Sequence, residues 1–188
     1  MLPTWFETAV NSEVFNAIFF VMPTMFSNTT PLLFGGGVPM DFRRNLKDGR
    51  RILGNGKTIR GFVWGCLGGF IMGLFVMWWF NNIVDAGFSM HIANGFFQGL
   101  GGVTGDIVGS FIKRRKNIPS GGALPVVDQT GFMFFGLLFG MIGVTDNTTG
   151  GVPLCLLTYL VIMVPLAAVV HFAANAVGYT LGWKDVWW

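Results

Sequence analysis

Long apolar segments are the feature of this sequence that most constrains how the chain can fold. The 188 residues are 52% hydrophobic and only 11% charged, whereas roughly a quarter of an average soluble domain is charged. Several windows are long enough to cross a hydrocarbon layer of about 30 Å, and they leave little room for a soluble domain. We therefore predict one all-α, polytopic membrane domain over residues 1–188, with five transmembrane helices at about 6–27, 61–84, 91–112, 131–147 and 152–181.

The basic residues predict the orientation of these helices. Seven of the twelve Lys and Arg lie in the loop at about 35–60, four form "KRRK" in the loop at about 113–130, and the last is Lys184. Loops rich in Lys and Arg stay in the cytoplasm. We expect a multi-pass protein of the cell membrane with its N-terminus outside and both loops, which would form the active site, on the cytoplasmic side.

Glycine recurs every fourth residue in three of the predicted helices. This spacing places the glycines on one helix face and lets neighbouring backbones approach closely, which is how helices associate in lipid. The glycines therefore predict tight helix packing. They are Gly61, Gly65, Gly69 and Gly73, then Gly101, Gly105 and Gly109, then Gly136 and Gly140.

Asp106 is an ionisable residue inside a predicted membrane helix. A charge there costs at least about 2.5 kcal/mol, so it indicates function. It lies about 10 Å along the helix from Lys113, near one stripe with Asn94, Gln98 and Ser110. For Asn94 and Gln98, hydrogen bonds that hold helices together are the better interpretation.

Asp128 is expected where the second basic loop returns to the membrane, and it could converge with Asp106. Two carboxylates among lysines and arginines suit Mg²⁺ bound to a polyphosphate. Such a site would transfer a phosphoryl or nucleotidyl group by positioning and electrostatics. His171 and Asn175 share a face of the last predicted helix, either packing it or forming a wall of the site.

The segment "GNGKTIRG" carries the Gly-Lys-Thr triplet that closes a P-loop, but the register is wrong. A P-loop would need glycine where this chain has Arg51, and an apolar run follows at Gly61. The same composition still suits phosphate, because Gly54 and Gly56 allow close backbone approach and Lys57 supplies charge. We expect this loop to fold over a nucleotide.

Three separated segments also resemble a known family. "GDIVGSFIKRRKNIPSGGALPVVDQTGF" and "GNGKTIRG" resemble motifs of the membrane cytidylyltransferases, the CDP-diacylglycerol synthase superfamily. "GGGVPMDFRRNLKDGRRILGNGKTIRGF" and "HFAANAVGYTLGWKDVWW" resemble more narrowly its archaeal branch, the CDP-archaeol synthases. Together the likeness covers essentially the whole chain.

The resemblance implies a reaction and its partners. CTP and 2,3-bis-O-(geranylgeranyl)-sn-glycerol 1-phosphate, a lipid held in the bilayer, would give a CDP-activated lipid and pyrophosphate, with Mg²⁺ as cofactor and no nucleic acid involved. With the charge pattern it suggests Asp106 and Asp128 as catalytic metal ligands beside catalytic Lys113 and Arg114. The residues expected at CTP are Gly54, Gly56, Lys57, Thr58, Arg60, Ser110 and Arg115, and those at the lipid phosphate are Arg43, Arg50, Arg51, His171 and Asn175.

The chain departs from the bacterial and eukaryotic relatives at one metal ligand. Those relatives have a second Asp three residues after the first, where Gly131 stands here. Either Asp41 or Asp48 substitutes, or fewer protein ligands hold the metal.

Two other functions are weighed against this one. A small transporter or channel would have Asp106 lining its pathway, but the polar residues gather at one side of the membrane. A CDP-alcohol phosphotransferase is suggested by "DGRR" at 48–51, although that family's Ala-Arg and later aspartates are missing.

Overall fold

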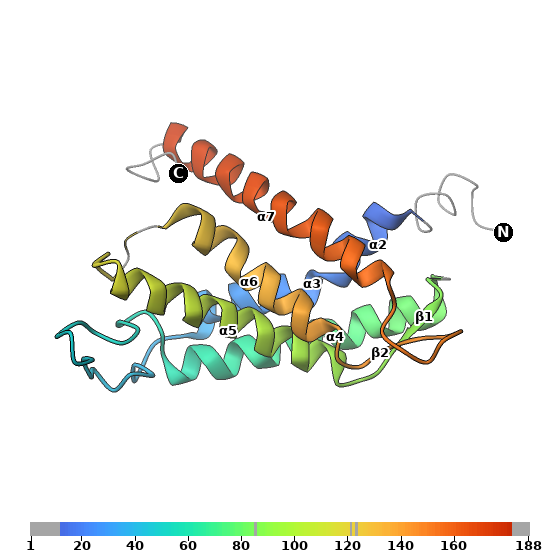
Figure 1. The fold of residues 1–188 in the computed structure, drawn as a ribbon, viewed down its shortest axis with the longest axis horizontal. Coiled ribbons are helices and arrows are strands. Elements are labelled where there is room, and N and C mark those ends of the chain that lie inside the picture. Colours follow the sequence, from blue (N-terminus) through green and yellow to red (C-terminus); the bar gives the residue numbers. More distant parts are fainter. Residues whose placement is uncertain (1–11, 85, 121, 123, 182–188) are drawn as a thin grey trace.

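The computed structural model describes residues 12–84, 86–120, 122 and 124–181. Figure 1 shows elongated helices lying side by side, with the loop at 35–58 at one end and two short strands at the other. The helices are α2 Glu13–Phe20, α3 Met22–Phe34, α4 Ile59–Asn82, α5 Asn94–Arg115, α6 Pro125–Gly140 and α7 Cys155–Thr180, and the strands are β1 Phe88–Met90 and β2 Val144–Asp146.

The first predicted helix extends further along the chain than the apolar window at 6–27. Helices α2 and α3 together cover 13–34, and residues 6–11 lie outside the described part. The extension includes the polar residues Thr29 and Thr30, whose hydroxyl groups donate to the carbonyls of Met25 and Phe26 at 3.0 Å. Because each hydroxyl is satisfied one turn back, these polar residues stay within a helix.

In the described part of the chain four helices follow the first, as predicted, but the bounds of two of them differ from the predicted windows. Helices α4 and α7 lie within three residues of the windows at 61–84 and 152–181. Helix α5 continues through Arg115, and α6 begins at Pro125 and ends at Gly140, whereas 131–147 was predicted. Proline at the first helical turn explains the earlier start of α6, because its missing N–H is not needed there. Asp128 is therefore in the first turn of a helix, not in a loop.

The fold is mostly helical, as predicted, and a small pair of strands that the sequence did not predict lies at the end far from the loop. Strands β1 and β2 form an antiparallel pair, with Phe88 opposite Asp146 and Met90 opposite Val144. Asn81 on α4 also bonds the backbone of Met90 twice, at 2.9 Å each. The pair satisfies backbone groups of two segments that connect helices, so the fold is mostly helical with a small sheet.

Glycines bring the central helices into backbone contact, as predicted. A Cβ placed on Gly69 of α4 would collide with the backbone of Gly99 on α5. A Cβ on Gly105 of α5 would collide in the same way with Gly131 on α6. Helix α5 thus packs closely against α4 on one side and α6 on the other.

A buried chain of hydrogen bonds joins three helices. The Thr24 hydroxyl on α3 donates to Gln98 Oε1 at 3.0 Å, and Gln98 Nε2 donates to Asn94 Oδ1 at 3.0 Å. Asn94 Nδ2 in turn donates to the carbonyls of Gly140 and Ile142 at 2.6 and 3.1 Å. Thr24, Gln98 and Asn94 are fully buried. The helix-packing interpretation of Asn94 and Gln98 is confirmed.

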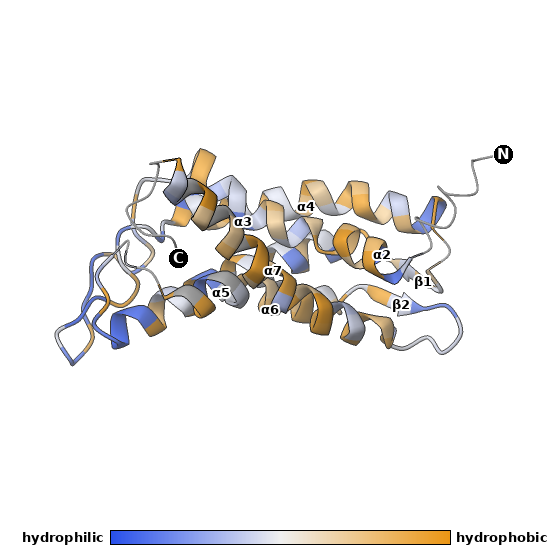
Figure 2. Ribbon diagram, turned by 90° about the horizontal axis from the view of Figure 1, so that it is seen from above, coloured by the Kyte–Doolittle hydropathy of each residue, from blue (hydrophilic) through white to orange (hydrophobic). Residues whose placement is uncertain are grey.

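The helices are apolar along their middle, and hydrophilic residues gather at the two ends (Figure 2). Two helical segments of the described chain are long and apolar enough to cross a membrane, Glu13–Phe34 and Ile59–Asn82. Val126–Gly140 and Cys155–Val170 are shorter apolar segments. The described structure is thus mostly helical, with two helical segments suited to a membrane, and the count of five spans stays a prediction.

Candidate active site

A lysine–carboxylate pair lies where the loop at 35–58 meets helix α5. Lys57 Nζ donates to Asp106 Oδ2, and both side chains are partly exposed, at 23% and 40%. They line a small cavity of about 30 Å³ together with Gly56 and Thr58. Thr58 is the N-cap of α4, where its hydroxyl oxygen accepts from the N–H of Gly61 at 3.0 Å. This cap fixes the start of α4 directly after Lys57.

A second pair of the same kind joins α5 to α6. Lys113 Nζ lies 2.7 Å from Asp128 Oδ1, and Asp128 Oδ2 accepts from the N–H of Leu124 at 2.9 Å. Asp128 is not among the residues that line the cavity at Asp106. The two carboxylates are thus held by different lysines.

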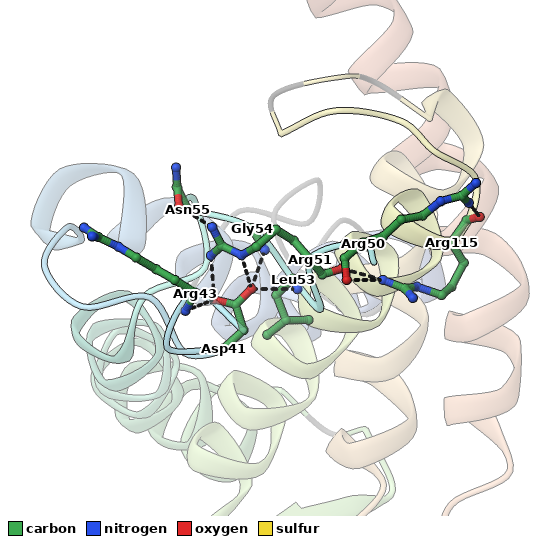
Figure 3. A network of polar contacts seen from close by, with 8 residues as sticks. All are labelled: Asp41, Arg43, Arg50, Arg51, Leu53, Gly54, Asn55 and Arg115. Atoms are coloured by element: carbon green, nitrogen blue, oxygen red, sulfur yellow. Dashed lines mark hydrogen bonds and ion pairs between the residues drawn. The ribbon is translucent and has the colours of Figure 1, made fainter. Parts of the chain in front are cut away.

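Asp41 organises the basic loop from a fully buried position (Figure 3). Its Oδ1 accepts from the N–H of Arg43 at 3.0 Å and from Arg51 Nη2 at 2.6 Å. Its Oδ2 accepts from Arg51 Nε at 3.1 Å and from the N–H groups of Leu53 and Gly54 at 3.0 Å. Burial alone raises the pKa of Asp41, but the Arg51 guanidinium and the three N–H groups outweigh burial and hold the pKa well below its usual range.

Arg115 ties the same loop to the end of α5. Its Nη1 lies 2.5 Å from Asp48 Oδ2, and its Nη2 donates to the carbonyl of Arg51. Its guanidinium also lies over the Phe111 ring, 5.2 Å from the centroid. In return, Arg50 Nη1 donates to the carbonyl of Arg115 at 2.6 Å. Arg115, which the sequence assigned to CTP, therefore holds the loop in place.

A second hollow lies between the loop and the segment that follows α5. Arg114 is 7% exposed there, and its Nη2 donates to the carbonyl of Pro119 at 2.9 Å. Gly54 has a φ of 106°, which favours glycine, and a Cβ on it would lie in tight contact with Ser120 Oγ at 3.2 Å and Arg114 Nη1 at 3.3 Å. We call this the arginine hollow, and its lining residues are Arg50, Arg51, Gly54, Asn55, Arg114, Asn117, Ile118, Pro119 and Ser120.

The structure brings most of the predicted residues to one end of the molecule but does not gather them into a single pocket. Arg43 and Arg60 are exposed there, and Ser110 is buried on α5. His171 and Asn175 belong to α7, but their side chains lie outside the described residues. Sequence reasoning missed Asn55, Asn117 and Ser120, because single polar residues in a loop carry no spacing signal that would reveal their convergence.

The carboxylates present fit a Mg²⁺ site of the kind completed by substrate. The described residues contain no group of three or more His, Cys, Asp or Glu side chains that could hold a metal alone. Mg²⁺ is commonly bound by one or two carboxylates plus substrate phosphates and water, which Asp106 beside an open cavity could provide. Asp41 cannot substitute for the missing ligand, because its two oxygens already accept five hydrogen bonds.

These features define a class: a helical membrane protein whose cationic end, with lysine–carboxylate pairs, is suited to phosphate groups at the membrane surface. Residues 10–188 match the CarS-like family model, described as CDP-archaeol synthase. The chain belongs to this family.

Relatives agree over nearly the full length. The CDP-archaeol synthases of Pyrococcus horikoshii and Methanocaldococcus jannaschii are each 38% identical, over 94% and 93% of this chain and 98% and 97% of their own. A solved structure, described as an intramembrane enzyme for archaeal membrane lipid biosynthesis, is similar with a TM-score of 0.67 and 30% identity, over 88% of this chain and 95% of that one.

Family membership makes the chain an enzyme of the membrane, a nucleotidyltransferase of lipid biosynthesis. It sets aside the transporter and the CDP-alcohol phosphotransferase that the sequence left as alternatives.

Proposed function

We propose that this enzyme transfers CMP from CTP to the phosphate of 2,3-bis-O-(geranylgeranyl)-sn-glycerol 1-phosphate, giving the CDP-activated archaeal ether lipid and pyrophosphate. The observation that carries the proposal is the Lys57–Asp106 pair in a cavity at the polar end of apolar helices. A lipid phosphate and a water-soluble nucleotide can meet at such an end while the lipid chains stay beside the helices. The family's CDP-archaeol synthases support the choice of substrates.

In the proposed reaction, an oxygen of the lipid phosphate attacks the α-phosphorus of CTP, and the bond from that phosphorus to the β-phosphate oxygen breaks. No protein nucleophile is needed, so the residues act by positioning and charge. Lys57 would leave Asp106 and turn to the phosphates, with Gly54, Gly56 and Thr58 lining their path. Lys113 and Arg114 would offset the charge of the leaving pyrophosphate, and Arg43, Arg60 and Ser110 remain proposed contacts for the two substrates.

Mg²⁺ is proposed as the cofactor, with Asp106 and Asp128 as its protein ligands. When bound, it would neutralise phosphate charge and polarise the reacting phosphoryl group. Lys57 and Lys113 now neutralise these two carboxylates, and each lysine could exchange its carboxylate for a substrate phosphate.

The proposed setting is the cell membrane, with five spans, the N-terminus outside and the reacting end at the cytoplasmic side. The seven basic residues of the loop at 35–60 and "KRRK" at 113–116 support this orientation.

The test is pyrophosphate release by purified protein supplied with CTP, Mg²⁺ and the lipid phosphate. Asp106→Asn should lower the rate by about a hundredfold or more while the protein stays folded. Asp146→Asn is the matched control, since Asp146 is the last residue of β2, at the end of the molecule far from the loop, and its substitution should leave the rate unchanged. A wild-type protein that forms no CDP-lipid would refute the proposal.

A further inference from the structure

The arginine hollow carries positive charge that the described residues neutralise only in part. Of its three arginines, Arg51 is paired with Asp41. Arg50 and Arg114 donate to the main-chain carbonyls of Arg115 and Pro119, and neither forms an ion pair within the described residues. The lining contains no Asp or Glu. Arg50 is also attracted by Asp48, which is paired with Arg115, so Arg114 is the arginine of the hollow for which the described residues show no counter-ion.

Arg114 makes this imbalance costly. Its side chain is more than nine-tenths buried, and its Nε has no hydrogen-bond partner in the described structure. Burying a guanidinium removes its hydration, and without an opposite charge the free-energy cost of that desolvation is not offset. An anion in the hollow would supply the missing charge and accept from the free donors.

We propose that the arginine hollow binds a pyrophosphate group: the terminal phosphates of the nucleotide before transfer, and the free product afterwards. This rests on the proposed function, which supplies both forms of the group. Several planar guanidinium groups suit a polyphosphate, because each can donate two parallel hydrogen bonds to phosphate oxygens. The Asn55 amide, whose oxygen accepts from Arg51 Nη1 at 3.0 Å, keeps its N–H groups for the ligand.

The position of the hollow agrees with this assignment. Gly54 lines the arginine hollow and Gly56 lines the cavity of Lys57 and Asp106. Two residues apart, their Cα atoms are separated by at most about 7.6 Å. The hollow and the cavity are thus lined by one short loop segment, and a triphosphate that follows this segment could place its α-phosphate at Asp106 and its terminal phosphates among the arginines. The hollow lacks carboxylates, so its affinity should not require a divalent metal.

The test is calorimetric titration of the purified full chain, in detergent with EDTA, by inorganic pyrophosphate, CTP and CMP. Arg50→Met and Arg114→Met should each weaken the binding of pyrophosphate and CTP about tenfold or more, the effect of losing a charge-assisted hydrogen bond. The affinity for CMP should not change in either variant. Arg44→Met is the matched control, because it removes the same charge from the same loop outside the hollow and should bind pyrophosphate like wild type.

Three results would overturn the assignment: no binding of pyrophosphate by wild type, binding by Arg50→Met and Arg114→Met equal to that of Arg44→Met, or an equal loss of affinity for CMP. Should Arg114→Met not fold, Arg50→Met decides, since Arg50 is exposed. Failure of the proposed function is a separate result. If the wild-type enzyme makes CDP-lipid but both variants bind pyrophosphate normally, the proposed function stands and only the assignment of the hollow is refuted.

Discussion

Asp41→Asn should open the basic loop without unfolding the helices. An asparagine has one side-chain oxygen, whereas each carboxylate oxygen of Asp41 accepts at least two hydrogen bonds. At least two donors would therefore face an NH₂ group, at about 1 kcal/mol each. The weakened pair with Arg51, which is 27% exposed and partly screened, adds about 1 kcal/mol. The free energy of opening the loop should fall by about 3 kcal/mol.

Hydrogen exchange read by mass spectrometry measures this loss. Exchange at the amides of Leu53 and Gly54 should accelerate about a hundredfold in Asp41→Asn. Asp48→Asn makes the same chemical change on the same loop, but Asp48 is 41% exposed and its pair with Arg115 is worth at most about 1 kcal/mol. Its exchange should rise about fivefold or less. Equal exchange in the two variants would refute the view that Asp41 organises the loop.

Three further predictions concern pH and packing. Because the pKa of Asp41 is lowered in the folded loop, its contribution to the stability of the loop is complete above the unfolded pKa of about 3.9 and is lost only as pH falls further. The Leu53 amide NMR signal should therefore persist through pH 4, and its loss at a higher pH would contradict the role of Asp41. Gly69→Val should lower the free energy of unfolding by about 1–3 kcal/mol through collision with Gly99, whereas Gly151→Ala, in an open turn, should not; equal thermal unfolding in detergent would disprove backbone contact there. Gln98→Leu should cost about 1–2 kcal/mol by stranding the polar groups of its partners, and a variant as stable as wild type would show that the buried chain of hydrogen bonds contributes nothing.

Helix positions show where sequence reasoning succeeded and where it failed. Hydropathy located α4 and α7 within three residues, because a long apolar segment makes up most of each helix. It misplaced α6, because the start of that helix depends on Pro125 and its end on the segment that pairs as β2. It also ended the first helix too early, since Thr29 and Thr30 look polar in sequence but are satisfied within the helix.

The candidate site divides in the same way. Asp106 was recognisable because a carboxylate within an apolar segment is energetically costly. The cationic loop was recognisable because its Lys and Arg residues can be counted in the sequence. Asp41 was weighed only as a metal ligand, and the structure instead makes it the acceptor that holds Arg51, Leu53 and Gly54. No periodicity encodes such a loop, because its contacts come from irregular turns.

The sequence by itself determined that this chain is a helical membrane protein of the CDP-archaeol synthase family, with a cationic end and a carboxylate, Asp106, within a predicted membrane helix. These properties follow from composition, hydrophobic length and motif, which are local. Only the tertiary structure decided that Lys57 pairs with Asp106, that Asp128 pairs with Lys113, and that Arg114 is buried in a second hollow. The reason is physical: the strength of a charge–charge contact depends on distance and burial, and both are set by how α4, α5 and the loop pack together.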